Sequence, residues 1–346
     1  MTDIKSLNRA ELTEFILEKG EKKYRSDQLF SWMHRALADS PEKMSNIPGS
    51  LKRIIREETE YTSLRAVDVQ TSKEDGTQKF LFALGDGNVI ESVLMRYRDW
   101  DSVCISSQVG CGMGCRFCAS TLDGCVRSLK PSEMLDQVYS IIRITGRSIS
   151  NIVIMGSGEP LANYDSLLRF IEIINDEKGL NIGERHITVS TCGLVPEIRR
   201  LADEKLKIGL AISLHAPNDK KRKELMPVAE RYSIEELMDA VRYYFDRTGR
   251  RITFEYALTK GFNDLNEDAL ELSSLLRGLN CHVNLIPVNP VRERGLKPST
   301  DRAVEAFKTK LEKNGINVTI RREMGRDIDG ACGQLRRKHL EDVLNV

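Results

Sequence analysis

The stretch Cys111-Gly-Met-Gly-Cys115-Arg-Phe-Cys118 decides the fold of this chain. Three thiols stand within eight residues, shortly after an apolar run at 103–105 that predicts a buried strand. The glycines around the thiols relax the backbone, so three thiolates can wrap one face of a cubane iron–sulfur cluster. One iron is then left without a protein ligand, and such an iron can bind a substrate.

Other metal sites use similar thiols. Structural zinc needs four closed ligands, and ferredoxin clusters take a fourth cysteine. Cys125 is the nearest candidate for a fourth ligand, but it does not stand at a customary spacing. A zinc site completed by a remote residue such as His215 stays open as an alternative.

Length and composition indicate the kind of protein in which these thiols occur. The chain has 346 residues, of which 40% are hydrophobic and 30% charged, which suits one large domain and a smaller one. Its net charge of +1 neither requires nor excludes a nucleic-acid partner. The sequence shows no signal peptide and no run of about twenty apolar residues, so we expect a cytoplasmic protein without a membrane partner. Its eight cysteines are then expected to be reduced, which favours metal binding and redox chemistry.

Residues 1–61 predict a small helical accessory domain, for which we expect an RNA-binding role. Asn8 and Glu11 have the spacing of a capping box, and further helices are expected at 26–37 and 50–58. After this domain the apolar residues recur about every second position. This alternation predicts a connecting β-hairpin over residues 62–98, with strands at 79–84 and 89–95. Glu91 interrupts the second strand, and composition alone makes it an exposed face residue more readily than a catalytic base.

From 99 to 325, strand and helix patterns alternate as βα units require. A helix is expected at 131–145, ended by Gly146, and another at 164–176. Strands are expected at 151–155, 185–190, 207–214, 251–257 and 281–286, with an additional strand at 317–322. Counting the strand with Cys104, about six units predict an α/β fold with a parallel, incomplete barrel.

Small polar groups follow the predicted strands. In such a barrel the loops at the carboxyl ends of the strands meet at one mouth. Four strand ends carry polar groups that this mouth would bring together, and Glu159 could hold a cationic amine; the residues are Gly158, Glu159, Ser190, Ser213, His215 and Asn289. We therefore expect a ligand site there.

Two more cysteines complete the chemistry-bearing residues. Cys332 lies between small residues in a segment at 326–346 and has the steric freedom of a mobile nucleophile. Cys104 lies seven residues before Cys111, on the strand that feeds the cysteine loop, so it is expected close to the same site.

These motifs together resemble the RlmN-type ribosomal RNA adenine carbon-2 methyltransferases of the radical S-adenosylmethionine (SAM) superfamily. The match covers nearly the whole chain and includes Gly158-Glu-Pro-Leu161, Ser213-Leu-His215, Met226-Pro227, Asn284-Leu-Ile-Pro287 and Asp327-Ile-Asp-Gly-Ala-Cys-Gly-Gln-Leu335. Ser157 is a departure, because family members commonly have Met there.

The resemblance implies a partial (β/α)6 radical SAM barrel and assigns roles residue by residue. Cys111, Cys115 and Cys118 would ligate one 4Fe–4S cluster per chain. SAM would be contacted by Gly158, Glu159, Ser190, Ser213, Leu214, His215 and Asn289. The chemistry would fall to Glu91, Cys104 and Cys332.

The resemblance also implies a reaction that consumes two SAM molecules per turnover. The first would methylate Cys332, and the second would be cleaved reductively to a radical that activates the S-methyl group. The resulting methylene radical would add to carbon 2 of adenine. Glu91 or Cys104 would remove the ring proton, and Cys104 would release the product through a transient disulfide.

The implied partners are 23S ribosomal RNA, transfer RNA as a second substrate, and an electron donor of the flavodoxin or ferredoxin type, with the protein acting as a monomer. Dispersed basic residues would form the RNA-binding face, at 220–223 and 336–338 and at Arg247, Arg250, Arg251, Arg292 and Arg294. The alternatives are a carbon-8 adenine methyltransferase of the Cfr type and a zinc-stabilised RNA-binding protein without catalysis.

Overall fold

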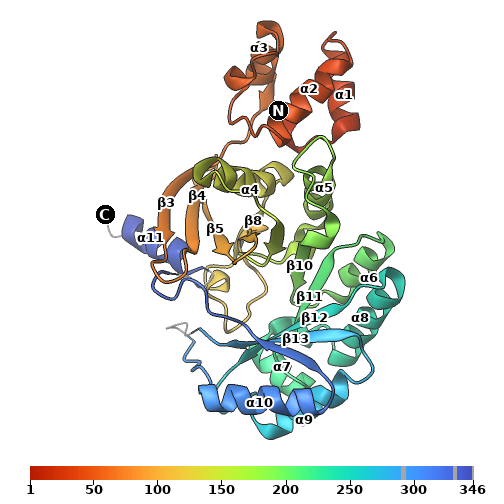
Figure 1. Ribbon diagram of the computed structural model, residues 1–346, viewed down its shortest axis with the longest axis vertical. Coiled ribbons are helices and arrows are strands. Elements are labelled where there is room, and N and C mark those ends of the chain that lie inside the picture. Colours follow the sequence, from red (N-terminus) through yellow and green to blue (C-terminus); the bar gives the residue numbers. More distant parts are fainter. Residues whose placement is uncertain (290–293, 330–332, 345–346) are drawn as a thin grey trace.

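The computed structural model describes residues 1–289, 294–329 and 333–344, and its main feature is one sheet of ten strands (Figure 1). The strand order is β14-β13-β12-β11-β10-β9-β6-β5-β4-β3. All neighbours from β6 to β14 pair in parallel, and all neighbours from β3 to β6 pair antiparallel. The order does not close on itself, so the prediction of an incomplete parallel barrel is confirmed.

The parallel strands have the predicted alternation with helices. The strands are β6 (Asp101–Cys104), β9 (Asn151–Ile154), β10 (Ile187–Thr191), β11 (Gly209–Ser213), β12 (Ile252–Leu258), β13 (Cys281–Pro287) and β14 (Asn317–Ile320). The helices between them are α4 (Pro131–Thr145), α5 (Tyr164–Asn175), α6 (Val195–Asp203), α7 (Asp219–Leu225), α8 (Ile234–Thr248), α9 (Asn266–Leu275) and α10 (Asp301–Lys313).

Local signals set several of these boundaries. The helix α4 begins with Pro131 at its first turn, Glu133 accepts the backbone N–H of Lys130 at 2.8 Å, and Gly146 ends the helix in the left-handed conformation at φ 68°. The capping box of Ser233 and Glu236 opens α8 as predicted. Sequence alone therefore places these helices to within a residue or two.

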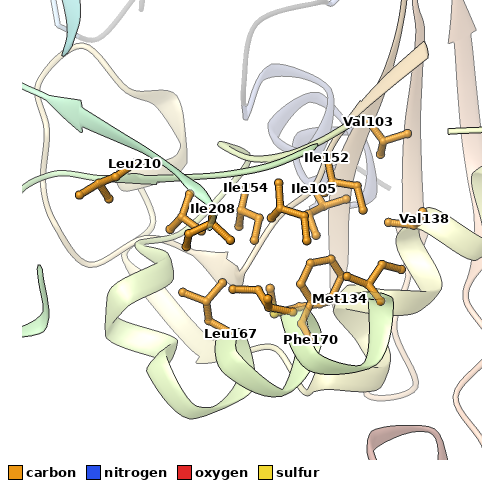
Figure 2. Close-up of a cluster of buried hydrophobic side chains, with 14 of the residues drawn as sticks. Val103, Ile105, Met134, Val138, Ile152, Ile154, Leu167, Phe170, Ile208 and Leu210 are labelled. Atoms are coloured by element: carbon orange, nitrogen blue, oxygen red, sulfur yellow. The ribbon is translucent and has the colours of Figure 1, made fainter. Parts of the chain in front are cut away.

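The core lies between the sheet and the helices outside it. In Figure 2, Ile152 and Ile154 of β9 and Val103 of β6 face Met134 of α4 and Phe170 of α5. These side chains have no exposed surface. Burial of each such side chain stabilises the fold by roughly 1.5–3 kcal/mol relative to exposure.

An antiparallel extension continues the barrel sheet through β3 (Arg65–Thr71), β4 (Gln78–Ala83) and β5 (Val89–Arg96). The predicted hairpin of β4 and β5 is confirmed. The strand β3 was not predicted, because its residues alternate irregularly and a bulge interrupts its register between Ala66 and Asp68. The extension is part of the same sheet as the barrel, since β5 pairs with β6.

The N-terminal helices α1 (Arg9–Glu18), α2 (Tyr24–His34) and α3 (Gly49–Glu58) form the predicted helical module at the top of Figure 1. The two-stranded pair β1 (Thr2–Asp3) and β2 (Thr59–Glu60) joins its ends. The fully buried ion pair of Lys5 and Asp136, at 3.0 Å, ties the module to α4. The capping box of Asn8 and Glu11 is confirmed.

Two small features complete the fold. The strands β7 (Gln108–Gly110) and β8 (Cys125–Ser128) pair antiparallel on either side of the cysteine loop. The helix α11 (Gln334–Leu344) lies beside β3 and β4 in Figure 1, and Leu335 packs against Leu81 of β4 and Val89 of β5. In the described part of the chain, no helix is long and apolar enough to cross a membrane.

Candidate active site

The cysteine loop is held in place from both sides. The backbone at Gly110 approaches Gly124 so closely that a Cβ would lie 2.1 Å from the Gly124 carbonyl oxygen, and Gly110 has φ +75°. Only glycine allows that contact. On the other side, the Arg116 N–H donates to the Leu225 carbonyl at 2.9 Å, and a Cβ on Gly114 would meet the Pro227 ring at 3.2 Å. The Met226-Pro227 motif therefore packs against the loop on the side opposite Gly124.

One cavity of about 260 Å³ brings most of the predicted site together. Its walls include residues of the cysteine loop and of the carboxyl ends of β9, β10, β11 and β13, namely Cys111, Cys115, Cys118, Gly158, Glu159, Ser190, Ser213, His215 and Asn289. Leu214 has no exposed side chain and does not line the cavity, but its N–H donates to the Glu255 carbonyl at 3.1 Å. Cys125 is exposed and is likewise not in the cavity wall.

The thiols need a cation to ionise where they stand. Burial raises the pKa of Cys111 to about 12, and burial followed by the neighbouring thiols raises the pKa of Cys115 as well. A bound metal cluster reverses this by stabilising thiolates. Within the described residues no group of three or more His, Cys, Asp or Glu side chains is arranged to hold a single metal ion.

Arg222 provides an independent test of whether an iron–sulfur cluster fits here. Its side chain on α7 is fully buried, and its Nη2 donates to the Cys192 carbonyl at 2.6 Å. Its Nε and Nη1 have no hydrogen-bond partner among the described residues. Burial lowers the pKa of Arg222, and the thiols of Cys192 and Cys115 oppose that shift, so the guanidinium lies near the cluster cysteines. A buried cation with two free donors beside these thiols fits an anionic cluster.

Glu159 and His215 are fixed by backbone contacts. The two carboxylate oxygens of Glu159 accept the N–H groups of Leu161 at 3.1 Å and Cys192 at 2.7 Å. Burial raises the pKa of Glu159, and these hydrogen bonds act against that rise. The Nδ1 of His215 accepts the Ala257 N–H at 2.9 Å, and burial lowers the pKa of His215 to about 3. His215 is therefore a neutral ring in the cavity wall.

Three further residues of the cavity were not predicted from the sequence. Glu255 of β12, Arg321 and Gln334 line it. Glu255 is 5% exposed, and its Oε1 accepts from Asn284 at 2.9 Å while its Oε2 has no partner among the described residues. Burial raises the pKa of Glu255. Glu255 is a single acid inside an apolar strand, and only its place opposite Asn284 in the register could have signalled it.

The three residues expected to carry chemistry are distributed differently. Cys104 ends β6 and is buried at 6% exposure, outside the cavity wall. Glu91 is 4% exposed, so the expectation that composition places it on an exposed face is wrong. It is buried because its carboxylate meets the N-terminus of α11 and the ammonium of Lys79. Cys332 lies outside the described residues.

The residue after Cys332 meets the cysteine loop directly. Gly333 has φ +82°, and a Cβ there would lie 2.8 Å from the Ser120 nitrogen. The Ser120 hydroxyl in turn lies 2.9 Å from that of Ser157, the residue that departs from the family pattern. The C-terminal segment is thus packed against the loop that carries Cys118.

Two members of the predicted RNA-binding face are buried. Arg222 faces the cluster cysteines, and Arg336 is 7% exposed with its Nε donating to the Val89 carbonyl at 3.1 Å. They were expected at the surface because they stand in basic runs, but a helix turns one member of such a run inward. Arg292 lies outside the described residues. Lys220, Lys223, Arg247, Arg251 and Lys338 are exposed.

The open parallel barrel with a three-cysteine loop at its mouth defines the class of protein, which is that of the radical SAM enzymes. The family model described as "Radical SAM superfamily" matches residues 105–273. A second, described as "Ribosomal RNA large subunit methyltransferase N-terminal domain", matches residues 2–60. The crystal structure of a radical SAM methyltransferase from Sphaerobacter thermophilus is 44% identical, with a TM-score of 0.93, 96% of this chain covered and 99% of that chain.

Curated relatives narrow the class. A probable dual-specificity RNA methyltransferase RlmN from Lachnospira eligens is 63% identical over 343 residues, covering 99% of this chain and 98% of the relative. One of the same name from Alkaliphilus oremlandii is 55% identical over 340 residues, covering 98% of this chain and 99% of the relative. The chain belongs to the RlmN family of radical SAM methyltransferases. Enzymes of this superfamily use a 4Fe–4S cluster and SAM, and the expectation of both cofactors is confirmed.

Proposed function

We propose that this protein methylates carbon 2 of an adenine in 23S ribosomal RNA, and in transfer RNA, with Cys332 as the methyl carrier. The observation that carries the proposal is the packing of Gly333 on Ser120, which joins the segment of Cys332 to the loop of Cys118. Cys111, Cys115 and Cys118 would hold the cluster. Glu159 and the polar strand ends of the same cavity would hold SAM.

The chain's own residues would handle the methyl group in two stages. The Cys332 thiolate would first take a methyl group from SAM, forming a C–S bond while S-adenosylhomocysteine leaves. The cluster, when bound, supplies the electron with which a second SAM is cleaved to a carbon radical that takes hydrogen from the S-methyl group. Carbon 2 of adenine is a poor nucleophile, and radical addition removes the need for it to act as one.

The same residues would then release the product. A base would take the ring proton of the adenine adduct, and the oxidised form of the flavodoxin- or ferredoxin-type carrier would take one electron. The Cys104 thiolate would then attack the sulfur of Cys332, so that the S–CH2 bond breaks with its electron pair left on carbon and a disulfide forms. The released carbon takes a proton to become the methyl group, and an external donor of the flavodoxin or ferredoxin type reduces the disulfide. Of the two candidates for removing the ring proton, the contacts of Glu91 favour Cys104, because both Glu91 oxygens accept backbone N–H groups. Cys104 would pass that proton to solvent before it attacks Cys332 as the thiolate.

Two cysteine variants test the proposal. Cys332→Ala should keep iron and SAM binding but transfer nothing to RNA. Cys104→Ala should load Cys332 and attack adenine but accumulate a covalent protein–RNA adduct, because nothing resolves the thioether. Peptide mass spectrometry of the wild-type protein should find one added methylene on the Cys332 peptide. Methyl transfer by Cys332→Ala would refute the carrier role.

Analysis of digested product RNA decides the remaining alternatives. We expect 2-methyladenosine; 8-methyladenosine would instead identify the carbon-8 reaction of the Cfr type. A colourless protein that contains zinc and leaves SAM intact would support the non-catalytic reading. We expect the anaerobic protein to be brown, with about four irons as a cubane cluster requires.

The RNA-binding face is proposed from the exposed members of the basic set. Charge reversal at Lys220, Lys223 and Lys338 should weaken RNA binding and flatten its dependence on salt. With fewer phosphate contacts, RNA binding releases fewer counterions. An unchanged affinity and salt slope would refute the face. We propose that the enzyme acts as a monomer in the cytoplasm, where its RNA substrates are.

A further inference from the structure

The segment that carries Cys332 is attached to the antiparallel extension by a series of contacts. The Asp327 carboxylate accepts from the Ser72 hydroxyl at 2.6 Å and from the Lys73 N–H at 2.8 Å. The Gly325 N–H donates to Asp75 at 2.9 Å. The extension thus serves as a platform that holds Gly325 and Asp327, which stand shortly before Cys332 in the sequence.

Two buried side chains of that platform, Lys79 and Glu91, contact the backbone just before and just after the stretch 330–332. The Lys79 ammonium donates to the Asp329 carbonyl at 2.6 Å, before the stretch. The Glu91 carboxylate accepts the Gly333 N–H at 2.7 Å and the Arg336 N–H at 2.6 Å, after the stretch. Lys79 and Glu91 contact each other at 3.1 Å, so one ion pair holds both ends.

The burial of this pair calls for an explanation. The side chains of Lys79 and Glu91 are 0% and 5% exposed. Removal of two charges from water is costly, and a buried pair is often replaced by apolar residues without loss of stability. Most of the other residues of these two strands are apolar, with Phe80, Leu81 and Phe82 following Lys79 in β4. Apolar residues at both positions would suit the sheet but could not hold a carbonyl and two N–H groups.

We propose that Lys79 and Glu91 form a positioning clamp that fixes the segment of Cys332 for methyl loading. The proposal rests on the proposed function of Cys332 as methyl carrier. Each ion contributes a different contact: the cation holds the incoming carbonyl, and the anion caps the helix that follows, where the N-terminus of α11 favours negative charge. Neither residue needs to touch SAM or adenine, so both are positioning residues.

The test uses the cluster-containing protein and scores methyl on the Cys332 peptide by mass spectrometry. Lys79→Met and Glu91→Gln should load methyl about 100-fold more slowly, because misplacement of a reacting group by about 1 Å costs that much in rate. Iron content and SAM binding should stay within about twofold of wild type, since the cavity is built by other residues. Hydrogen exchange at Gly333 and Arg336 should become faster. Lys130→Met, which breaks a half-exposed pair with Glu60, is the matched control and should load normally.

A double variant separates positioning from stability. Lys79→Met with Glu91→Met removes both charges, so it should recover much of the thermal stability that either single change loses. It should still load methyl slowly, because no group then holds the two ends of the stretch. Normal loading by the double variant would overturn the clamp.

The remaining outcomes are also decisive. If Glu91→Gln loads Cys332 normally but stalls as an RNA adduct, Glu91 acts as a base and the clamp is wrong. If wild-type protein carries no methyl on Cys332 at all, the proposed function fails, whatever the variants do. If wild-type protein and the variants carry the same amount of methyl on Cys332, the clamp is wrong but the proposed function stands.

Discussion

The cysteine loop and the segment that carries Cys332 meet at Ser120 and Gly333, but they are held in different ways. The loop is positioned on one side by near neighbours in sequence, through the pairing of β7 with β8 and the contact of Gly110 with Gly124, and on the other by Leu225 and Pro227. The segment is positioned by residues 242 to 259 positions earlier in the chain. Apart from the junction of Ser120 with Gly333, the loop and the segment are therefore held by different sets of contacts, and we expect that each set can be disrupted without the other.

The largest expected effect comes from the loop. Cys115→Ala should reduce iron content to below about a tenth of wild type and abolish methyl on Cys332, because a cubane cluster would have only three protein ligands in the proposed site. Iron analysis and peptide mass spectrometry measure both. Cys281→Ala, which removes another buried thiol in β13, should keep its iron. Retention of a full cluster by Cys115→Ala would mean that another residue ligates it.

The next effect comes from the junction. Gly333→Ala adds a Cβ at φ +82°, which costs about 1–2 kcal/mol, and places it 2.8 Å from the Ser120 nitrogen. Iron content should be unchanged while methyl loading of Cys332 falls about tenfold, since about 1.4 kcal/mol is a factor of ten. Gly249→Ala at φ +64° has nothing within 4 Å and should load normally. Loss of iron in Gly333→Ala would show that loop and segment are not independent.

A subtler effect sharpens the account of the loop. Arg222→Met should retain the cluster but make it harder to reduce, because a buried positive charge near the thiols stabilises the added electron. We expect roughly a tenfold lower reduced fraction at a fixed potential, equivalent to about 59 mV for a one-electron couple. A redox titration followed by electron paramagnetic resonance measures this, with the exposed Arg247→Met as control. An unchanged potential would remove Arg222 from the cluster environment.

The smallest effect is a pH dependence of the segment. Burial raises the pKa of Asp75, but hydrogen bonds from Gly325 and Thr77 outweigh it and lower the pKa to about 2. Because the folded pKa lies below the ordinary value of 3.8, the stabilisation is complete above that value and is lost as pH falls toward 2. Exchange of the Gly325 amide in cluster-free protein should therefore accelerate across this window. In Asp75→Asn the exchange of the Gly325 amide should no longer accelerate across this window. If the same acceleration persists in that variant, a group other than Asp75 causes the pH dependence.

How far sequence predicts this molecule follows the same division. The cysteine loop, the polar strand ends and helices such as α4 were predicted because spacing, caps and glycines are local signals. The burial of Glu91 and of Arg222 was not predicted, because composition alone made the first an exposed strand residue and the second a member of an exposed basic run. Their burial depends on partners far along the chain, namely the N-terminus of α11 for Glu91 and the cluster cysteines for Arg222. The irregular strand β3 was missed for a related reason, since its register is set by β4.

The long-range attachment of the C-terminal segment also bears on how the enzyme matures. Strands β3 to β5 leave the ribosome more than two hundred residues before Gly333, which binds Glu91 at a separation of 242 positions. Domains fold from the N-terminal side during synthesis, so the platform and much of the barrel can form while Gly333 is not yet available. In that interval the loop lacks its contact with Gly333 at Ser120. We therefore expect that the loop with Cys118 can acquire its cluster before the segment that follows Cys332 packs against Ser120.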